Sequence, residues 1–453
     1  MSVPIALFSV LGYEINPAFF LAPLVAVAFL FAFPNRYVIA FTAAAVGGAV
    51  SVLVANYADP QNVVKSALGL LLMLIAPSFF FLGRWIGAKR CNLERLCFWL
   101  ALFSVVFLLP VTIRLLFNGE PVRAYIGVGY AVLNAQWFGL PVFASFGVLS
   151  LAYLICLQMF ILAGAMTRVN RMSFKAIFFI GLSAAVFLVM GSDSRFAQMC
   201  IAWLAITAVG YWIFRRESLN TALVLLAIAI GVGGTLARIS TVDLRLYQTA
   251  TTIISNIGTE QVSKAEAIDR KIEQKIEETV GPQANASSLP PSELAVIKKE
   301  AIVEVEKEHT VADITTGRGR LFSAGLEELS ASPIIGNGFN GYGRFSPNGA
   351  DQILSANTST HVYYLTIFWK GGLIFGLPLL AFLLMAARDG FNNRAWATGV
   401  GFYITSMVAL AFGPMALTWD ILYVPSAGAL AWLLFGVLAG GHHDAGRHQE
   451  LAV

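Results

Sequence analysis

Apolar residues run along this chain in long uninterrupted stretches rather than in alternation with polar ones. A helix rises ~1.5 Å per residue, so roughly 17–25 apolar residues span a hydrocarbon core ~30 Å thick. Eleven stretches meet this length, at residues 17–34, 37–56, 66–86, 97–117, 138–163, 174–191, 196–214, 220–237, 360–386, 396–415 and 420–440. A transmembrane barrel would instead show segments of about ten residues with alternating polarity. The pattern predicts an all-α polytopic membrane protein with about 11–12 transmembrane helices.

Composition supports lipid as the solvent for most of the chain. Hydrophobic residues make up 57% of the 453 residues and charged residues 12%, whereas a soluble domain carries about 25% charged residues. The net charge of +4 is small and not clustered, unlike the basic patch of a nucleic-acid-binding protein. All four cysteines lie in or beside apolar stretches. We therefore expect neither a disulfide framework nor a cysteine-ligated metal in the polar part of the chain.

Basic residues in every second connector predict the orientation of the chain, because such residues favour the cytoplasmic side. The connectors that carry them follow the first, third, fifth, seventh, ninth and eleventh stretches and hold Arg36, Arg84, Lys89, Arg90, Arg95, Arg168, Arg171, Lys175, Arg215, Arg216, Arg388, Arg394 and Arg447. This places the C-terminus in the cytoplasm and the N-terminus outside. Residues 1–12 are apolar but lack the basic start of a cleavable signal. A dip of these residues into the membrane would add one helix.

One large polar segment interrupts the apolar pattern between the eighth and ninth stretches. Its middle, 260–309, holds seven basic and eleven acidic residues, which predicts charged surface helices of a solvated lid or spacer. We expect four parts in the chain. They are a bundle of transmembrane helices at 1–237, a periplasmic loop domain at 238–359, C-terminal transmembrane helices at 360–440 and a cytoplasmic tail at 441–453.

Arg195 is the first residue with candidate chemistry. It follows Gly-Ser-Asp-Ser at the start of the seventh stretch, on the predicted outer surface. A guanidinium binds a phosphate through two parallel hydrogen bonds, so Arg195 is suited to hold the head group of an anionic lipid. A salt bridge to Asp193, or an arginine that snorkels at the interface, is an equally simple interpretation.

Two further arginines, Arg318 and Arg320, lie in the last third of the loop. Residues 320–329 predict a short amphipathic helix, because apolar residues recur there at helical spacing. Gly336 and Gly338 follow, and they permit tight turns or a close approach of the backbone to a ligand. With a third glycine they match G-x-G-x-x-G, but no βαβ unit surrounds the match, so it does not indicate a dinucleotide site. The simpler interpretation is a turn that returns the chain to the membrane.

His361 opens the ninth stretch, where the loop returns to the membrane. Histidine titrates near neutral pH, so it can accept a proton from a hydroxyl. Leu365 and Phe368 share its helical face. The alternative interpretation is an interfacial histidine that caps the start of the helix.

In their order along the chain, these motifs resemble the O-antigen ligase and O-antigen (exopolysaccharide) polymerase family of bacterial membrane glycosyltransferases. The resemblance covers residues 170–440, and it rests on Ser194-Arg195 at the start of a span, Thr316-Gly-Arg318 followed by Phe322, Pro333-x-x-Gly336-x-Gly338, and His361-x-x-x-Leu365 with Gly371 further along. The chain differs from the family in its enlarged loop, at Val362, where Asn or Ser is frequent, and at Phe322, where Trp is frequent.

The resemblance implies a fold of the GT-C type and a reaction at the periplasmic face of the bacterial inner membrane. A glycan would pass from an undecaprenyl-diphosphate carrier to an acceptor hydroxyl, with inversion at the anomeric carbon and without a metal or other cofactor. Arg195 and Arg318, or Arg320 in place of Arg318, would clamp the diphosphate. His361 would accept the proton of the acceptor. The residues expected to support the site are Tyr364, Gly336 and Gly338.

The acceptor stays open within this resemblance. It is lipid A-core for a ligase, a second lipid-linked glycan for a polymerase, and a protein hydroxyl for an oligosaccharyltransferase. Outside the resemblance, the alternatives are a lipid-linked-glycan flippase or other transporter, and a non-catalytic scaffold. A transporter is expected to show internal symmetry and charges near the middle of its spans. Here the charges gather on the predicted outer side and in one loop.

Overall fold

The structure of the protein is a computed structural model that describes residues 8–10, 13–15, 35–88, 92–118, 136–137, 140–141, 148–192, 195–237, 318–341, 343–345, 359–418, 420–423 and 427–440. The chain divides into two compact units, one made of Met1–Leu244 with Ala324–Val453 and the other of Arg245–Ser323. Nearly all described residues belong to the first unit. The helix predicted at 17–34 and the charged helices predicted within 260–309 lie outside the described residues.

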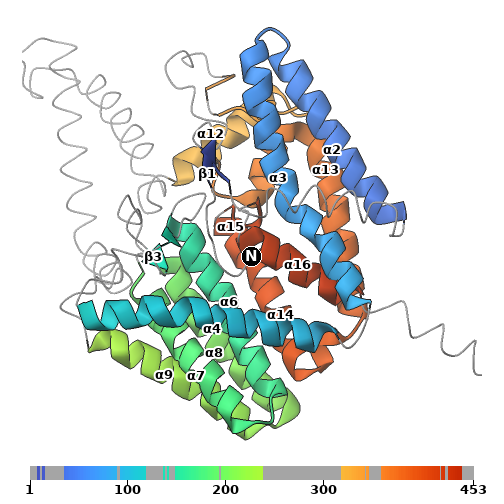
Figure 1. Cartoon of the computed structure of the whole chain (residues 1–453). Helices are drawn as coiled ribbons and strands as arrows, with labels where there is room; N and C mark the ends of the chain where they lie inside the picture. The colour runs from blue at the N-terminus through green and yellow to red at the C-terminus, as the bar shows by residue number, and fades with distance from the viewer. Residues whose placement is uncertain are drawn as a thin grey trace, which may run out of the picture. The chain divides into compact units, whose positions relative to one another are not determined.

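Helices make up almost all of the described chain (Figure 1). They are α2 (Asn35–Asn56), α3 (Pro60–Gly87), α4 (Asn92–Asn118), α6 (Val148–Arg168), α7 (Met172–Met190), α8 (Arg195–Arg215), α9 (Ser218–Leu236), α12 (Arg318–Ala331), α13 (Tyr363–Asn392), α14 (Gly399–Leu410), α15 (Ala416–Thr418) and α16 (Ala427–Gly440). A π-helical turn, η6 (Ala411–Met415), joins α14 to α15. The short turns η5 (Ala395–Ala397) and η7 (Ile421–Tyr423) flank this segment.

Strands form only two small antiparallel hairpins among the described residues. β1 (Phe8–Val10) pairs with β2 (Tyr13–Ile15), with Phe8 opposite Ile15. β3 (Gln136–Trp137) pairs with β4 (Leu140–Pro141), with Trp137 opposite Leu140. The fold is therefore all-α in its spanning part.

Eight helical segments of the described chain are long and apolar enough to cross a membrane. They lie in α2, α3, α4, α7, α8, α9, α13 and the continuous segment from α14 to α15. The described parts of α6 and α16 are apolar but shorter. This confirms a multi-pass helical membrane protein, and the predicted stretches from 37–56 onward agree with these helices in order and type, while the total of 11–12 transmembrane helices stays a prediction.

Two predicted helix starts were wrong. The stretch predicted at 138–163 is α6 at Val148–Arg168, and the β3–β4 hairpin stands where its first residues were expected. The stretch predicted at 420–440 is α16 at Ala427–Gly440, preceded by η7. Hydropathy alone therefore placed both starts too early.

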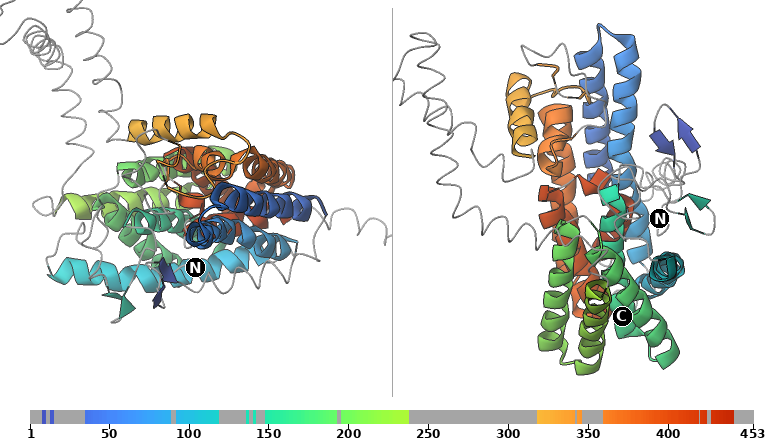
Figure 2. Two further views of the ribbon diagram at one scale, coloured as in Figure 1. Left: turned by 90° about the horizontal axis from the view of Figure 1, so that it is seen from above. Right: turned by 90° about the vertical axis from the view of Figure 1, so that its left-hand side faces the viewer.

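The spanning helices pack in two groups within the first unit (Figures 1 and 2). α2, α3, α13 and α16 form one group, and α4, α6, α7, α8 and α9 form the other. α14 joins the groups, because it contacts α6 and α8 on one side and α16 on the other. α4 crosses α6 and α7 steeply, and in the right-hand view of Figure 2 it is seen end-on while α6 and α7 run lengthwise.

Glycines allow α3 and α16 to pack backbone against backbone. A Cβ on Gly83 would lie 1.8 Å from the Leu433 carbonyl oxygen, and a Cβ on Gly436 would lie 2.1 Å from that of Phe80. Small residues at such contacts are how helices approach closely in lipid, where no hydrophobic force drives them together. This close contact fixes α16 beside α3.

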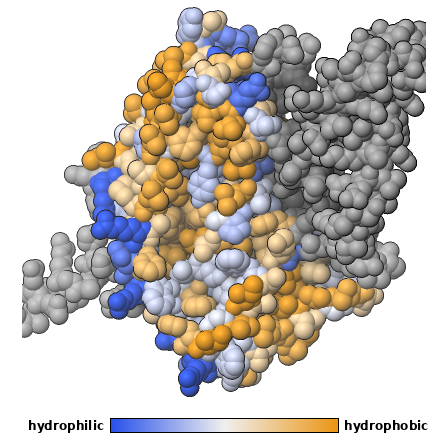
Figure 3. Space-filling view, turned by 180° about the vertical axis from the view of Figure 1, so that it is seen from behind, coloured by the Kyte–Doolittle hydropathy of each residue, from blue (hydrophilic) through white to orange (hydrophobic). Residues whose placement is uncertain are grey.

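Large apolar side chains point away from the helix groups as well as into them. Ile39, Ile206, Ile213 and Leu384 are each more than 60% exposed, as expected for side chains that face lipid. Figure 3 shows one such face, on which apolar residues cover most of the surface and hydrophilic residues gather at its ends and along one edge. The exposed apolar surface supports insertion of both helix groups into a membrane.

Contacts between helix ends gather the basic connectors at one end of the helices. Arg36 at the start of α2 and Arg84 at the end of α3 both pair with Asp389 near the end of α13. Arg168 at the end of α6 pairs with Glu94 at the start of α4. We call this the basic end, and the opposite end, where α13 begins, the loop end. Which side of the membrane the basic end faces stays a prediction from the basic residues.

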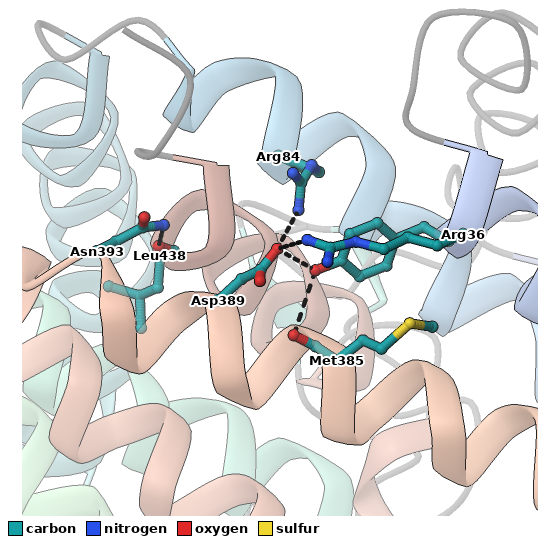
Figure 4. A network of polar contacts seen from close by, with 7 residues as sticks. Arg36, Arg84, Met385, Asp389, Asn393 and Leu438 are labelled. Atoms are coloured by element: carbon teal, nitrogen blue, oxygen red, sulfur yellow. Dashed lines mark hydrogen bonds and ion pairs between the residues drawn. The ribbon is translucent and has the colours of Figure 1, made fainter. Parts of the chain in front are cut away.

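At the basic end, polar contacts form a network around Asp389 (Figure 4). One carboxylate oxygen of Asp389 lies 2.6 Å from Arg36 Nη2, 3.2 Å from Arg84 Nη1 and 2.5 Å from Tyr37 Oη. The guanidinium of Arg84 also lies over the Tyr37 ring, 4.4 Å from its centroid. Tyr37 Oη lies 3.3 Å from the Met385 carbonyl oxygen. The network ties α2, α3 and α13 together with close polar partners, so we interpret it as structural.

Candidate functional site

The chain enters α13 through a short polar segment at the loop end. Val362 is extended and its side chain cannot cap the helix. Thr360 supplies the polar contacts instead: its hydroxyl accepts from the Val362 N–H at 3.3 Å and lies 2.8 Å from the Thr366 hydroxyl. The Thr360 N–H also donates to that hydroxyl at 3.2 Å. Both threonines are fully buried, so the position of the segment just before α13 is well fixed.

His361 adopts a left-handed backbone conformation, with φ of 58°. This conformation is uncommon outside glycine, and it persists only where surrounding contacts hold it. Here Ser359 holds it, because its Oγ accepts from the His361 N–H at 3.3 Å and lies 3.4 Å from Nδ1 of the ring. His361 is partly buried and Ser359 is 9% exposed. The titratable ring of His361 therefore lies at the loop end, on a backbone that Ser359 helps to hold.

Asp420 is a buried carboxylate beside this segment. It is 1% exposed, and neither of its carboxylate oxygens has a partner at close hydrogen-bond geometry among the described residues. The hydroxyls of Ser359 and Thr366, the His361 N–H and Lys370 all face it. Burial raises the pKa of Asp420 to about 6, although these four neighbours lower it. Sequence reasoning did not find Asp420, which lies far from His361 along the chain.

Lys370 lies on α13 and faces the same carboxylate. It is 3% exposed, and its Nζ donates to the Asn340 carbonyl oxygen at 3.1 Å and lies 4.8 Å from the centroid of the Trp369 ring. An ionisable residue inside a span is costly and often functional. This was the available signal for Lys370, and sequence reasoning did not weigh it.

Glu328, on α12, is the third buried charged residue on this side of α13, after Asp420 and Lys370. It is 6% exposed and accepts from Trp369 Nε1 at 2.9 Å and from the Gly343 N–H at 2.6 Å. Lys370 faces Glu328 as well as Asp420. Glu328 therefore has hydrogen-bond partners at close distance, whereas the oxygens of Asp420 have none at that geometry among the described residues.

Gly336 and Gly338 belong to a turn that pairs with an interruption in α13. At Gly372 the backbone of α13 leaves the helical conformation, with φ of 64° and ψ of −167°. The Gly338 N–H donates to the Lys370 carbonyl at 3.0 Å, and the Leu373 N–H donates to the Pro333 carbonyl at 2.9 Å.

The absence of side chains on these glycines lets the two backbones meet. A Cβ on Gly336 would lie 2.5 Å from the Gly372 nitrogen, and a Cβ on Gly338 would lie 2.3 Å from that of Ala55. Both glycines have φ near 70°, which glycine adopts readily. The structure thus gives Gly336 and Gly338 a packing role.

α2 holds the same turn from the other side. Ser51 Oγ donates to the Ile335 carbonyl at 2.6 Å, and Asn56 Nδ2 donates to the Gly338 carbonyl at 3.2 Å. Asn340 Nδ2 donates to Asn56 Oδ1 at 2.8 Å. The turn is therefore built into the first unit, and it fixes the loop end of α13.

The predicted arginines stand at helix starts. Arg195 is the first residue of α8, and Arg318 and Arg320 lie in the first turn of α12. The helix predicted at 320–329 is α12, Arg318–Ala331, which confirms that prediction. The side chains of all three arginines lie outside the described residues, so the diphosphate clamp stays a prediction.

Tyr364 lies in the first turn of α13, and its hydroxyl donates to the Phe412 carbonyl in η6. The carbonyls of a π-turn leave the regular helical ladder and accept such bonds. Tyr364 thereby joins the start of α13 to the end of α14. Of the residues predicted for the site, the described part brings His361 and Tyr364 to the same turn of chain.

Metal ligands do not gather in the described ranges, which contain no group of three or more His, Cys, Asp or Glu side chains able to hold a metal ion. Comparison with known proteins gives no family: no protein-family model matches the chain, and no curated protein matches it.

Proposed function

We propose that the chain is a membrane glycosyltransferase that moves a glycan from undecaprenyl diphosphate to an acceptor hydroxyl. The reaction would take place at the periplasmic face of the bacterial inner membrane, in O-antigen or exopolysaccharide assembly. The enzyme would act as a polymerase on a second lipid-linked glycan, or as a ligase on lipid A-core. The proposal includes a GT-C type of fold with 11–12 transmembrane helices and a periplasmic loop domain.

One observation carries the proposal: His361 is held in a left-handed backbone where α13 begins, beside the buried carboxylate of Asp420. Strained residues gather at catalytic sites because packing must hold the reactive group in place. The site lies at the end of the helices away from the basic connectors, which in the proposed orientation is the end that a lipid-linked donor in the outer leaflet would reach. His361 is thus suited to act as a general base.

In the proposed reaction, the acceptor oxygen attacks the anomeric carbon and the carbon–oxygen bond to the diphosphate breaks. His361 takes the proton of the acceptor hydroxyl, and the diphosphate leaves with the bonding electrons. Arg195 with Arg318 or Arg320 would bind the diphosphate and stabilise its growing negative charge. The sugar inverts because the attack is direct. The mechanism needs no metal.

The test of His361 uses purified protein in liposomes with a labelled undecaprenyl-diphosphate oligosaccharide. His361→Ala should lower the rate of transfer about 10²–10⁴-fold, the range that general-base catalysis contributes. His448→Ala, in the tail, is the matched control and should transfer at the rate of the unmodified protein. Full activity in His361→Ala would show that His361 is not the base.

The clamp is tested with the same donor. Arg195→Ala and Arg318→Ala should each lower transfer about 10²–10³-fold, as expected for the loss of one group that stabilises developing charge. Donor binding and transfer unchanged in both variants would contradict the clamp. Products identify the acceptor: a ladder without added core indicates a polymerase, a single transfer onto core indicates a ligase, and transfer to protein indicates an oligosaccharyltransferase.

A lipid-linked-glycan flippase or other transporter is the second candidate. The observation that favours it is the interruption of α13 at Gly372, close to the buried Lys370, which faces Asp420. Interrupted helices and buried charges often line transport sites. Liposomes with a fluorescent lipid-linked glycan and no acceptor distinguish the two. Movement across the bilayer that is lost in Asp420→Asn, with no transfer under any condition, would favour the transporter.

A further inference from the structure

We infer that the pocket between the first turns of α4 and the end of α6, at the basic end, binds the head group of an anionic phospholipid. The pocket has a volume of about 350 Å³. The residues that line it are Glu94, Arg95, Phe98, Trp99, Arg168 and Val169. None of them belongs to the candidate functional site, so the inference does not depend on the proposed function.

Positive charge exceeds negative charge among the residues that line the pocket. Arg95 and Arg168 are both exposed, and Glu94 is the one acidic residue of the lining. Glu94 pairs with Nε of Arg168, and Arg95 makes no ion pair with a described residue. A guanidinium carries five N–H groups, so the contact through Nε leaves the terminal nitrogens of Arg168 as further donors. Two guanidinium groups at one pocket suit a phosphate, which they bind through paired hydrogen bonds.

The ion pair in the pocket is not needed to pack the helices. The side chains of Arg168 and Glu94 are 56% and 38% exposed, and pairs this exposed contribute little to stability. Packing comes instead from Phe98, whose ring centroid lies 5.3 Å from that of Phe174 and 5.6 Å from that of Phe178, both on α7. Replacing the charged residues should therefore leave the fold intact, which makes the pocket testable by substitution.

Apolar side chains continue from the pocket along one face of α4. Trp99, Phe103 and Val106 follow one another at helical spacing, and each is about half exposed. The ring centroids of Trp99 and Phe103 lie 6.5 Å apart. Tryptophan is frequent at the membrane interface, where its ring lies at the level of the head groups. A molecule with a charged head and an apolar tail matches both the pocket and this face, whereas free phosphate matches the pocket alone.

The charges favour an anionic lipid over a zwitterionic one. The choline group of a zwitterionic head group would meet arginines of like charge, whereas an anionic head group carries no cation. Basic pockets between spanning helices bind anionic head groups, and each arginine near the head group contributes about 5-fold in affinity. Glu94 opposes the phosphate, so its charge should lower the affinity.

The test measures lipid binding to the full-length protein by native mass spectrometry. The detergent-solubilised protein is mixed with equal concentrations of phosphatidylglycerol, which is anionic, and phosphatidylcholine, which is zwitterionic. We expect the protein to bind more phosphatidylglycerol than phosphatidylcholine. Arg95→Gln and Arg168→Gln should each lower the affinity for phosphatidylglycerol about 5-fold and leave that for phosphatidylcholine unchanged.

Two further variants separate the pocket from the general charge of the surface. Arg215→Gln is the matched control, because Arg215 is exposed at the end of α8 and does not line the pocket. This variant should bind phosphatidylglycerol like the unmodified protein. Glu94→Gln should instead raise the affinity severalfold, since it removes the opposing carboxylate and releases Arg168. A damaged fold would not bind more tightly, so this gain distinguishes a binding role from a structural one.

Three results would overturn the inference. The first is equal binding of the two lipids, or an affinity for phosphatidylglycerol that none of the substitutions at Glu94, Arg95 and Arg168 changes. The second is complete displacement of phosphatidylglycerol by excess inorganic phosphate, which would mean that the pocket takes a free anion. The third is a dimer that dissociates in Arg95→Gln, which would assign this face to a second copy of the chain.

Discussion

Two buried carboxylates lie at opposite ends of α13, and their surroundings differ. Asp389, at the basic end, has two arginines and a tyrosine hydroxyl within 3.2 Å of one oxygen. Asp420, at the loop end, is the more buried of the two, and no close partner for its oxygens lies within the described part of the chain. Buried polar groups usually have partners, and each exception needs an explanation.

The backbone differs in the same way between the two ends. Around Asp389, α13 is a regular helix, whereas near Asp420 it is interrupted at Gly372 and preceded by left-handed His361. We interpret the basic end as built to hold the helices together, and the proposed function assigns to the loop end the task of holding reactive groups in place. Removing the charge of Asp389 and removing that of Asp420 are therefore predicted to change the stability of the protein in opposite directions.

Removing the carboxylate at the basic end should have the largest effect on stability. Asp389→Ala leaves Arg84, which is 4% exposed, as a buried charge without its anion. Loss of one partner from a buried pair costs about 3–5 kcal/mol. The measurement is thermal unfolding of the detergent-solubilised protein, followed by loss of the native peak in size-exclusion chromatography. Exposed Glu327→Ala is the control, and equal unfolding temperatures for the two variants would refute the structural role of Asp389.

The sequence predicted the spans better than their ends. Long apolar runs predict helices because lipid leaves backbone groups no other partners. The starts at 138 and 420 were misplaced because hydropathy reports apolar content and not the residue at which a helix begins. The local sequence around His361 does not predict its left-handed backbone, because that conformation depends on contacts with Ser359 and on burial by distant helices.

The candidate site was predictable only in part. His361 stood out because it is titratable at a membrane boundary, whereas Asp420 is hidden in an apolar run and meets His361 only in the folded chain. Lys370 carried a signal of its own, as a charge within a span. Contacts between residues far apart in sequence cannot be derived from spacing, so the polar cluster required the structure.

Filling the interruption of α13 should have the next largest effect. A Cβ on Gly372 would lie 2.1 Å from the Ile334 carbonyl oxygen, in a backbone conformation that alanine rarely adopts. Strain and overpacking together predict that Gly372→Ala loses roughly 2–4 kcal/mol of stability. Gly233→Ala is the matched control, because its Cβ would meet nothing within 4 Å in α9. Similar unfolding temperatures for both variants would mean that α13 tolerates a regular helix at this point.

Neutralising the carboxylate at the loop end should stabilise the protein, the opposite of the effect at Asp389. Burial raises the pKa of Asp420 to about 6 from 3.8, so ionisation of this group opposes folding. The penalty is absent below about pH 4 and complete above about pH 6, where it reaches about 3 kcal/mol. Asp420→Asn should therefore unfold at a higher temperature than the unmodified protein at pH 7.5, and the difference should vanish towards pH 4.

The control for this prediction is Glu328→Gln. Glu328 already has close donors in Trp369 and Gly343, so removing its charge should not stabilise the protein at any pH. Destabilisation by Asp420→Asn at pH 7.5 would mean that the carboxylate holds the fold together after all, and the contrast between the two ends of α13 would be lost.

The smallest effect should come from the second arginine at the basic end. Arg36 lies closer to Asp389 than Arg84 does, at 2.6 Å against 3.2 Å, but its side chain is 50% exposed whereas that of Arg84 is 4% exposed. Exposed ion pairs contribute about 0–1 kcal/mol and weaken with salt, because water and ions screen them. Arg36→Ala should thus lower the unfolding temperature slightly, with the loss reduced in 1 M NaCl. Arg84→Ala should lower it much more at either salt concentration. If the two variants unfold alike, proximity rather than burial decides the strength of these pairs, and burial would no longer explain why the surroundings of Asp389 and Asp420 differ in their effect on stability.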